Sequence, residues 1–227
     1  SLGLVGSEMC IRDRVRMTSP LSYILRRLRE EHEYHAKREP DVFWVTDLTM
    51  CPRKRELELQ LPALNVWRPE PRFIHAILLH YGVEYLLMFY YGIRDWDVHL
   101  EREFTRQVEV DGELLTVKGR PDVYATEPHG PVAEIVEIKT GRAGQEIPHP
   151  HHIEQVRYYL WLTNAARGWL LYILPDRMAE FRIQKPFTDE DVINAMRATE
   201  APRYDWECRL CHLRAFCAIA SRRREGK

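Results

Sequence analysis

Residues 132–139 constrain the fold of this chain most, because both faces of the strand that they predict are largely apolar. Side chains alternate along a strand, which places Ala133 and Ile135 on one face and Val136 and Ile138 on the other. Such a strand is typical of the centre of a sheet that is covered on both sides. We therefore expect a mixed α/β (α+β) fold in which helices flank the sheet.

The segments around this strand carry turn, strand and helix signals. Asp111-Gly112 is a tight-turn signal between two alternating segments, 99–110 and 113–125, which are predicted to form a hairpin. Helices are predicted over residues 20–38, 47–60, 69–91, 151–167 and 188–199, and further strands over 42–45, 169–174 and 178–184.

Two of these helices have cap signals, and one has a tyrosine-rich stripe. Ser19 and Thr188 precede the first and last helices, where a hydroxyl side chain can accept from a free backbone N–H. The tyrosines of the long helix over residues 69–91 are assigned to the core in preference to an interface; they are Tyr81, Tyr85, Tyr90 and Tyr91.

Length and composition predict one soluble domain. The chain has 227 residues, of which residues 1–16, including Cys10, read as a non-native leader and are set aside. Residues 17–227 suffice for a single core and show no linker. No uninterrupted apolar run reaches the roughly 18 residues of a membrane span, and no secretory signal is visible, which predicts a cytoplasmic protein without a membrane partner. The formal net charge of -1 means that nucleic acid would have to bind in a local basic groove.

Polar residues converge at two places in the predicted strands. Asp122 ends the string GRPD, and Glu137 and Lys139 share a face within the string EIK. A divalent ion held by carboxylates supplies a nucleophilic water and relieves charge on a reacting phosphodiester. Asp122, Glu137 and the carbonyl of Ile138 are therefore candidate ligands for Mn²⁺ or Mg²⁺, and Lys139 is a candidate for stabilising negative charge. The bare spacing also occurs by chance among surface charges, but its place at the end of a mostly apolar strand favours a site.

Three further polar residues fit the same chemistry. Gln155 and Tyr159 lie four residues apart on the helix after the lysine, so they share a face from which both can hydrogen-bond a phosphate or base. We include them in the candidate catalytic set. His80 lies inside the 69–91 helix and is a candidate metal ligand through a ring nitrogen, although a lone helical histidine is more often a packing or surface residue.

Four cysteines predict a second metal centre. Cys208, Cys211 and Cys217 lie within ten residues, and Cys51 is a fourth thiol far upstream. In a cytosolic chain this pattern favours a bound metal or cluster over disulfides, and four thiolates suit either an iron–sulfur cluster or tetrahedral zinc. A site that joins all four would close a long loop and restrict the unfolded chain.

In their order along the chain, these residues resemble the RecB-type branch of the PD-(D/E)xK nucleases. The cysteines on either side resemble the iron–sulfur subset, which includes AddB-like nucleases, and the size is similar to that of the stand-alone CRISPR-associated Cas-four family. The resemblance implies a restriction-endonuclease-like mixed sheet flanked by helices, with a C-terminal cysteine-cluster cap formed by residues 206–227. It favours a [4Fe–4S] cluster over [2Fe–2S] or zinc. The chain departs from the family at Ala76, where a glycine is frequent, and this leaves His75 as the alternative to His80.

The same resemblance implies a metal-dependent DNA exonuclease that acts mainly on single-stranded DNA with 5′-to-3′ polarity. Its role would be to process DNA ends into prespacers for the CRISPR integrase complex. Two alternatives stay open from the residues alone: a DNA-binding or scaffold subunit that keeps the fold without catalysis, and a redox or DNA-charge sensor built on the cluster. Metal binding that depends on Asp122 and Glu137 separates the nuclease from the scaffold.

Overall fold

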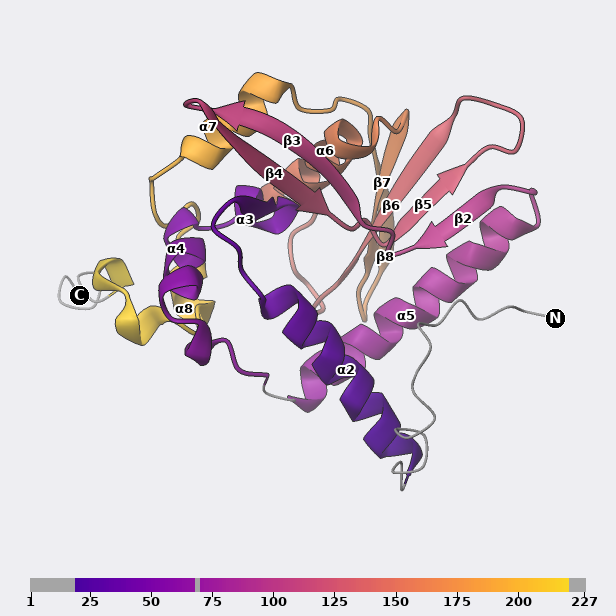
Figure 1. Cartoon of the computed structure of the whole chain (residues 1–227). Coiled ribbons are helices and arrows are strands. Elements are labelled where there is room, and N and C mark those ends of the chain that lie inside the picture. Colours follow the sequence, from indigo (N-terminus) through magenta and orange to yellow (C-terminus); the bar gives the residue numbers. More distant parts are fainter. Residues whose placement is uncertain (1–18, 68–69, 221–227) are drawn as a thin grey trace, which may run out of the picture.

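The computed structural model describes residues 19–67 and 70–220, whose strands form two sheets (Figure 1). The larger sheet has the order β2–β5–β6–β7–β8, with the bounds Asp97–Leu100, Val123–Thr126, Ala133–Thr140, Arg167–Ile173 and Met178–Ile183. The smaller sheet has the order β1–β4–β3, with the bounds Val42–Trp44, Glu113–Gly119 and Phe104–Val110. Parallel pairing joins β6 to β7 and β1 to β4, and the other pairs are antiparallel, which confirms the predicted mixed sheet. Residues 1–16, the predicted leader, lie outside the described residues. So do residues 221–227, the end of the predicted cysteine-cluster cap, which we call the cysteine segment (residues 206–227) below.

Strand β6 occupies the centre of the larger sheet and is buried on both faces. On one face, Ile135 belongs to an apolar cluster that includes Val156 of helix α6. On the other face, Val136 and Ile138 belong to a second cluster, which includes Tyr91 of helix α5. The alternation read from the sequence therefore directs one strand into two separate apolar layers, as predicted.

Helices cover the sheets from both sides. Their bounds are Pro20–Ala36 (α2), Val45–Thr49 (α3), Pro52–Gln60 (α4), Pro62–Leu64 (η1), Pro71–Gly92 (α5), Pro150–Thr163 (α6), Asp189–Arg197 (α7), Glu207–Leu210 (α8) and Arg214–Phe216 (η2). Helix α5 packs on β2, β5 and β6, whereas α6 contacts strands of both sheets and lies between them (Figure 1). Strand β6 is therefore enclosed between α5 and α6.

Three predicted elements are each divided in the structure. The strand predicted over residues 99–110 is β2, which belongs to the larger sheet, and β3, which belongs to the smaller. The helix predicted over residues 47–60 is two helices, α3 and α4, which are separated at Cys51 because Pro52 can begin a helix but cannot continue one. The strand predicted over residues 113–125 is divided at Pro121, so that β4 joins the smaller sheet and β5 the larger. A proline donates no backbone hydrogen bond and restricts the residue before it, which ends the β4 ladder there.

Helix α5 differs from the expectation that its tyrosines are core residues. Tyr91 is buried, but Tyr85 and Tyr90 are exposed, so the core assignment was wrong for these two. The stretch Phe73–Gly92 is also long and apolar enough to cross a membrane by length and composition alone, with a mean hydropathy of 1.3, although no uninterrupted apolar run is present. The same helix carries His80 and Glu84, whose polar atoms lie close to Asp122.

Candidate active site

The break at Pro121 places Asp122 next to the central strand. Asp122 immediately precedes β5, whose first residue, Val123, pairs with Val136 of β6. This register brings the Asp122 carboxylate within reach of the β6 backbone, and its Oδ2 accepts a hydrogen bond from the N–H of Ile138 at 2.5 Å. The turn at Pro121, which interrupts the predicted strand, therefore places Asp122 in the site.

Helix α5 supplies the histidine. His80 Nε2 lies 3.0 Å from Asp122 Oδ2 and 3.5 Å from Glu84 Oε1, which is one helical turn further along. The ligand atoms of these three residues all lie within 4.8 Å of one another. The alternative histidine, His75, has an exposed side chain, and the structure brings His80 rather than His75 to Asp122.

Lys139 takes part in a series of hydrogen bonds that connects β6 with α6. Lys139 Nζ donates to Glu137 Oε1 at 2.6 Å and to Gln155 Oε1 at 2.8 Å. Gln155 donates in turn to the Tyr159 hydroxyl at 3.1 Å, and that hydroxyl donates to the carbonyl of Arg120 at 3.3 Å. Gln155 and Tyr159 are buried, and in this structure Gln155 contacts Lys139 while Tyr159 contacts Gln155.

Two buried carboxylate oxygens in this site accept no hydrogen bond from the described residues. They are Glu137 Oε2 and Glu84 Oε1, on side chains that are each 3% exposed. A buried acceptor without a donor is costly, and a carboxylate oxygen is a preferred ligand of Mg²⁺ and Mn²⁺. The donor set therefore fits a divalent cation between α5 and β6.

The pKa values of the site report its excess of negative charge. Burial lowers the pKa of His80, but hydrogen bonding and attraction to Asp122 outweigh it and bring that pKa to about 9. Burial, then repulsion from Glu101 and Asp122, raises the pKa of Glu84 to about 8. Burial and Asp122 also raise the pKa of Glu137. A bound cation would replace the protons that these groups otherwise retain.

Comparison with known proteins identifies this arrangement. The profile of the PD-(D/E)XK nuclease superfamily matches residues 53–220. A CRISPR-associated exonuclease Cas4 from Saccharolobus solfataricus is 33% identical over 200 residues, which cover 86% of this chain and 96% of that protein. A crystal structure of the protein SSO0001 superposes with a TM-score of 0.80 at 32% identity and covers 88% of this chain and 96% of that one. The chain belongs to the Cas4 (Cas-four) exonuclease family of the PD-(D/E)XK nucleases. It is a nuclease by family, and the resemblance read from its motifs is confirmed.

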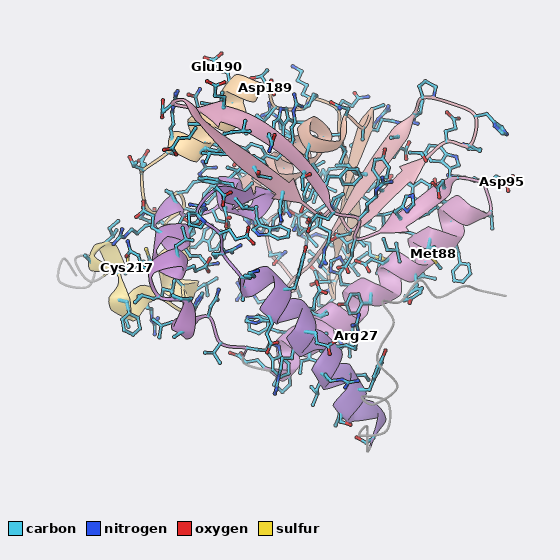
Figure 2. The ribbon with its side chains drawn as sticks, in the orientation of Figure 1. Arg27, Met88, Asp95, Asp189, Glu190 and Cys217 are labelled. Atoms are coloured by element: carbon cyan, nitrogen blue, oxygen red, sulfur yellow. The ribbon has the colours of Figure 1, made fainter. Side chains whose placement is uncertain are left out.

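This Cas4-family chain also gathers its four cysteines. Cys51, Cys208, Cys211 and Cys217 line one cavity and form no disulfide with one another. Burial raises the pKa of the Cys51 thiol. In Figure 2, Cys217 lies at one edge of the molecule, in the C-terminal segment. The sequence therefore predicted the meeting of Cys51 with a triplet more than 150 residues away, although it gave no contact that would hold them together.

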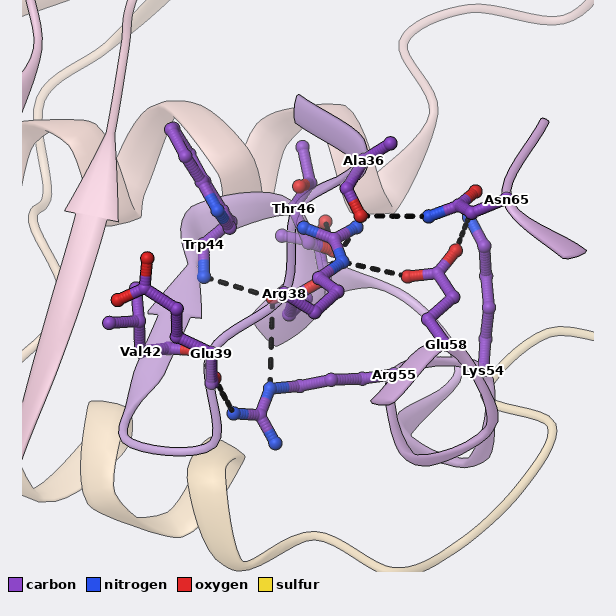
Figure 3. Close-up of polar contacts among 12 residues, drawn as sticks. Ala36, Arg38, Glu39, Val42, Trp44, Thr46, Lys54, Arg55, Glu58 and Asn65 are labelled. Atoms are coloured by element: carbon purple, nitrogen blue, oxygen red, sulfur yellow. Dashed lines mark hydrogen bonds and ion pairs between the residues drawn. The ribbon is translucent and has the colours of Figure 1, made fainter. Parts of the chain in front are cut away.

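Glu207 provides that contact. Its carboxylate is 5% exposed and accepts from the backbone N–H of Cys51 at 2.7 Å and from that of Tyr204 at 2.8 Å. A buried ion-pair network joins α3 and α4, the two helices on either side of Cys51 (Figure 3). There, Arg38 donates to Glu58 at 2.8 Å and lies 3.5 Å from Asp47. Glu207 therefore joins the C-terminal segment to the backbone of Cys51.

The candidate residues missed by the sequence reasoning are Glu84 and Glu207. Glu84 had a usable signal, because it follows His80 by one helical turn and must share its face. Glu207 had none, since its partner backbone is 156 residues away in the chain.

Proposed function

We propose that this nuclease is a metal-dependent DNA exonuclease that acts mainly on single-stranded DNA with 5′-to-3′ polarity. The observation that supports it most is the meeting of Asp122, Glu137 and Lys139 at the edge of the central strands, beside His80. His80, Asp122, Glu137 and the Ile138 carbonyl would hold Mn²⁺ or Mg²⁺. When bound, the cation supplies an acidified water and relieves charge on the phosphodiester.

The chain's own residues then position the reacting groups. Lys139 has three N–H donors, of which Glu137 and Gln155 occupy two, so one remains for the attacking water or a phosphate oxygen. The Gln155–Tyr159 pair fixes the direction of that donor, because Tyr159 is itself anchored on the backbone of Arg120. Lys139 would therefore stabilise developing negative charge without having to reorganise.

We also propose that the four cysteines hold an iron–sulfur cluster, with [4Fe–4S] preferred to [2Fe–2S] or zinc. The four thiols line one cavity, which supports a centre that they share. The preference for [4Fe–4S] rests on the resemblance to the iron–sulfur subset of the family. Thiolates suit either centre, so the metal content has to be measured.

The biological role proposed for this chain is the processing of DNA ends into prespacers, in the cytoplasm and beside the CRISPR integrase complex. The relative from Saccharolobus solfataricus, a CRISPR-associated exonuclease, supports this role. Helix α5 is proposed to be a helix of the nuclease and not a membrane span, because His80 and Glu84 on it contribute to the site.

The test is cleavage of 5′-labelled and 3′-labelled single-stranded DNA with Mn²⁺ by the protein purified without oxygen. Asp122→Asn is expected to abolish cleavage, and Asp97→Asn, which changes an exposed acid that pairs with His99 among the described residues, is expected to preserve it. The two labels report polarity. A folded, coloured wild-type protein that leaves both substrates intact would overturn the exonuclease and favour the scaffold alternative.

A further inference from the structure

Helix α5 leaves an apolar surface open to solvent. The helix runs along the periphery of the molecule, with the larger sheet on one side of it (Figure 1). In an 18-residue window of the stretch Phe73–Gly92, only 6% of the residues are buried. We call the exposed line of residues on its outer side the α5 stripe, which consists of Leu78, Gly82, Tyr85, Leu86, Phe89 and Ile93. A contiguous apolar surface, unlike single exposed apolar residues, marks an interaction site.

The α5 stripe has the spacing of a seam between packed helices. Its central residues follow one another at intervals of four, three and four, and they are Leu78, Gly82, Tyr85 and Phe89. On the opposite side of the helix, Glu84 and Tyr91 are buried. One face of α5 therefore serves the core of the nuclease, and a second face with helical period is left for a partner.

Gly82 gives the stripe a point of close approach. A Cβ at Gly82 would meet nothing within 4 Å among the described residues, and its φ is not positive. Neither packing nor backbone geometry within this chain therefore requires a glycine there, although glycine inside a helix costs stability relative to alanine. A helix that packs on the stripe would use it, because small residues let two helix backbones approach closely.

The sequence on either side of Gly82 matches the α5 stripe to a second copy of itself. Leu79 and Tyr85 lie three residues from Gly82, and Leu78 and Leu86 lie four residues from it. In an antiparallel pair with a two-fold axis at Gly82, Leu86 of one copy would lie opposite Leu78 of the other. Residues 73–92 contain one charged residue, the buried Glu84, so such a pair would leave no charge of α5 unpaired in the interface.

The exposed area of the α5 stripe is sufficient for a dimer. Its large side chains are between 44% (Leu78) and 82% (Ile93) exposed. At about 200 Å² for a fully exposed large side chain, the stripe offers about 600 Å² per copy. Two copies would bury about 1,200 Å², which is the lower limit for specific, stable interfaces.

A lipid surface suits the α5 stripe less well. Helices that lie on membranes are rich in Lys and Arg, which attract anionic lipids. Residues 73–93 contain neither, and the exposed acids Asp95 and Asp97 follow them. The charge around the stripe therefore favours an uncharged apolar helix over an anionic surface as its occupant.

We propose that α5 is a homodimer interface in which two copies of this chain pack their α5 stripes antiparallel, with Gly82 at the two-fold axis. The test is sedimentation velocity of the full chain with its cysteine centre intact, from nanomolar to near-millimolar concentration. The wild type should change from monomer to dimer over this range. Leu86→Glu buries an unpaired carboxylate in each copy and should weaken dimerisation at least tenfold. Met178→Glu, which changes an exposed apolar residue of β8, should leave dimerisation unaltered.

A second variant separates the interface from folding. Gly82→Leu has free space in the monomer and a better helix propensity, so its thermal unfolding midpoint, measured where the wild type is monomeric, should not fall. In the dimer the two leucine side chains would meet at the axis and hold the helices apart. Dimerisation should therefore weaken at least tenfold in a variant whose fold is at least as stable.

Three results would overturn the proposal. One is a wild-type chain that stays monomeric over the whole range, and another is dimerisation that Leu86→Glu leaves unchanged. Dimerisation that Gly82→Leu strengthens or leaves unaltered would overturn the axis at Gly82. If the monomeric wild type instead floats with vesicles of phosphatidylcholine and phosphatidylglycerol, and Leu86→Glu does not, the occupant of the stripe is a lipid surface and not a second copy.

Discussion

Glu207→Gln is expected to release the C-terminal cysteine segment from Cys51. The carboxylate accepts two backbone hydrogen bonds, at 2.7 Å from Cys51 and at 2.8 Å from Tyr204, and it is 5% exposed. A glutamine keeps the shape but has one acceptor oxygen, so its amide N–H₂ must face the other backbone N–H. One charge-assisted bond is lost, and a buried donor is left without a partner.

A hydrogen bond to a charged group contributes about 1.5–3 kcal/mol, so opening of the segment should become roughly ten- to 150-fold easier. The assay is amide hydrogen exchange of residues 206–217 in the metal-free, reduced protein, which reports the opening without any contribution from a bound cluster. Protection of this segment should fall by that factor, while protection of the central strand β6 changes little.

The matched control is Glu113→Gln, which makes the same change at an exposed position of β4. It should leave exchange of the cysteine segment unaltered. Unchanged protection of residues 206–217 in Glu207→Gln would refute the view that Glu207 holds the segment, and would assign that role to the apolar cluster around Leu57 and Leu213.

Two further predictions concern packing and pH. A Cβ at Gly119 would lie 2.7 Å from Leu162 and 2.8 Å from Tyr159, so Gly119→Ala should lower the free energy of unfolding by about 1–3 kcal/mol in urea titrations. Gly82→Ala, in α5 with nothing within 4 Å, should instead raise it by up to about 1 kcal/mol, and equal effects would contradict the close approach. The pKa of His152 is lowered to about 2, mainly by burial. Below pH ~6.5 the His152 side chain is therefore protonated in the unfolded chain but stays neutral in the native protein. The contribution of His152 to stability is therefore present above that pH and is reduced by about 1.4 kcal/mol at pH 5.5, so the loss of stability between pH 7.5 and 5.5 should be smaller by that amount in His152→Gln than in the wild type.

Local signals in the sequence were sufficient for the elements that they specify. The two-faced apolar pattern placed β6 at the centre of the sheet, and Asp111-Gly112 made the turn between β3 and β4 with both residues at positive φ. Ser19 and Thr188 each accept a hydrogen bond from the first turn of their helices, as predicted. In each case the cause and the effect lie within a few residues.

Features that depend on residues far apart in the chain could not be predicted in the same way. The strand predicted over residues 113–125 alternates without interruption apart from Pro121, and nothing local says that its two halves belong to different sheets. Tyr85 and Tyr90 are exposed because α5 is apolar around most of its circumference, while the sheet covers one side of it. The candidate site was found from the sequence because each of its motifs is short, and Glu84 could have been added from its place one helical turn after His80.

The stretch just before the cysteine triplet contacts α6, the helix that carries Gln155, the hydrogen-bond partner of Lys139. Arg203 donates to the carbonyl of Leu48 at 2.6 Å and pairs with Glu154 of α6 at 3.2 Å. The His151 ring of α6 lies 5.2 Å from the Trp206 ring, between centroids. Helix α6 also carries Gln155 and Tyr159. If the C-terminal segment becomes more mobile, Lys139 should therefore lose its fixed orientation, while the proposed cation ligands on α5, β5 and β6 should keep their positions.

Cys217→Ser tests that order of effects. With one thiolate removed, the segment should loosen and kcat should fall several-fold as Lys139 loses its fixed direction, while Mn²⁺ affinity changes less than threefold because His80 and Asp122 are held by other elements. Single-turnover cleavage and Mn²⁺ titration measure the two quantities, and Cys10→Ser is the matched thiol control. Loss of Mn²⁺ binding to the level of Asp122→Asn would contradict the argument, because it would mean that the cysteine centre supports the cation ligands themselves. An unchanged kcat would contradict it from the other side, since α6 would then hold Lys139 without help from the segment.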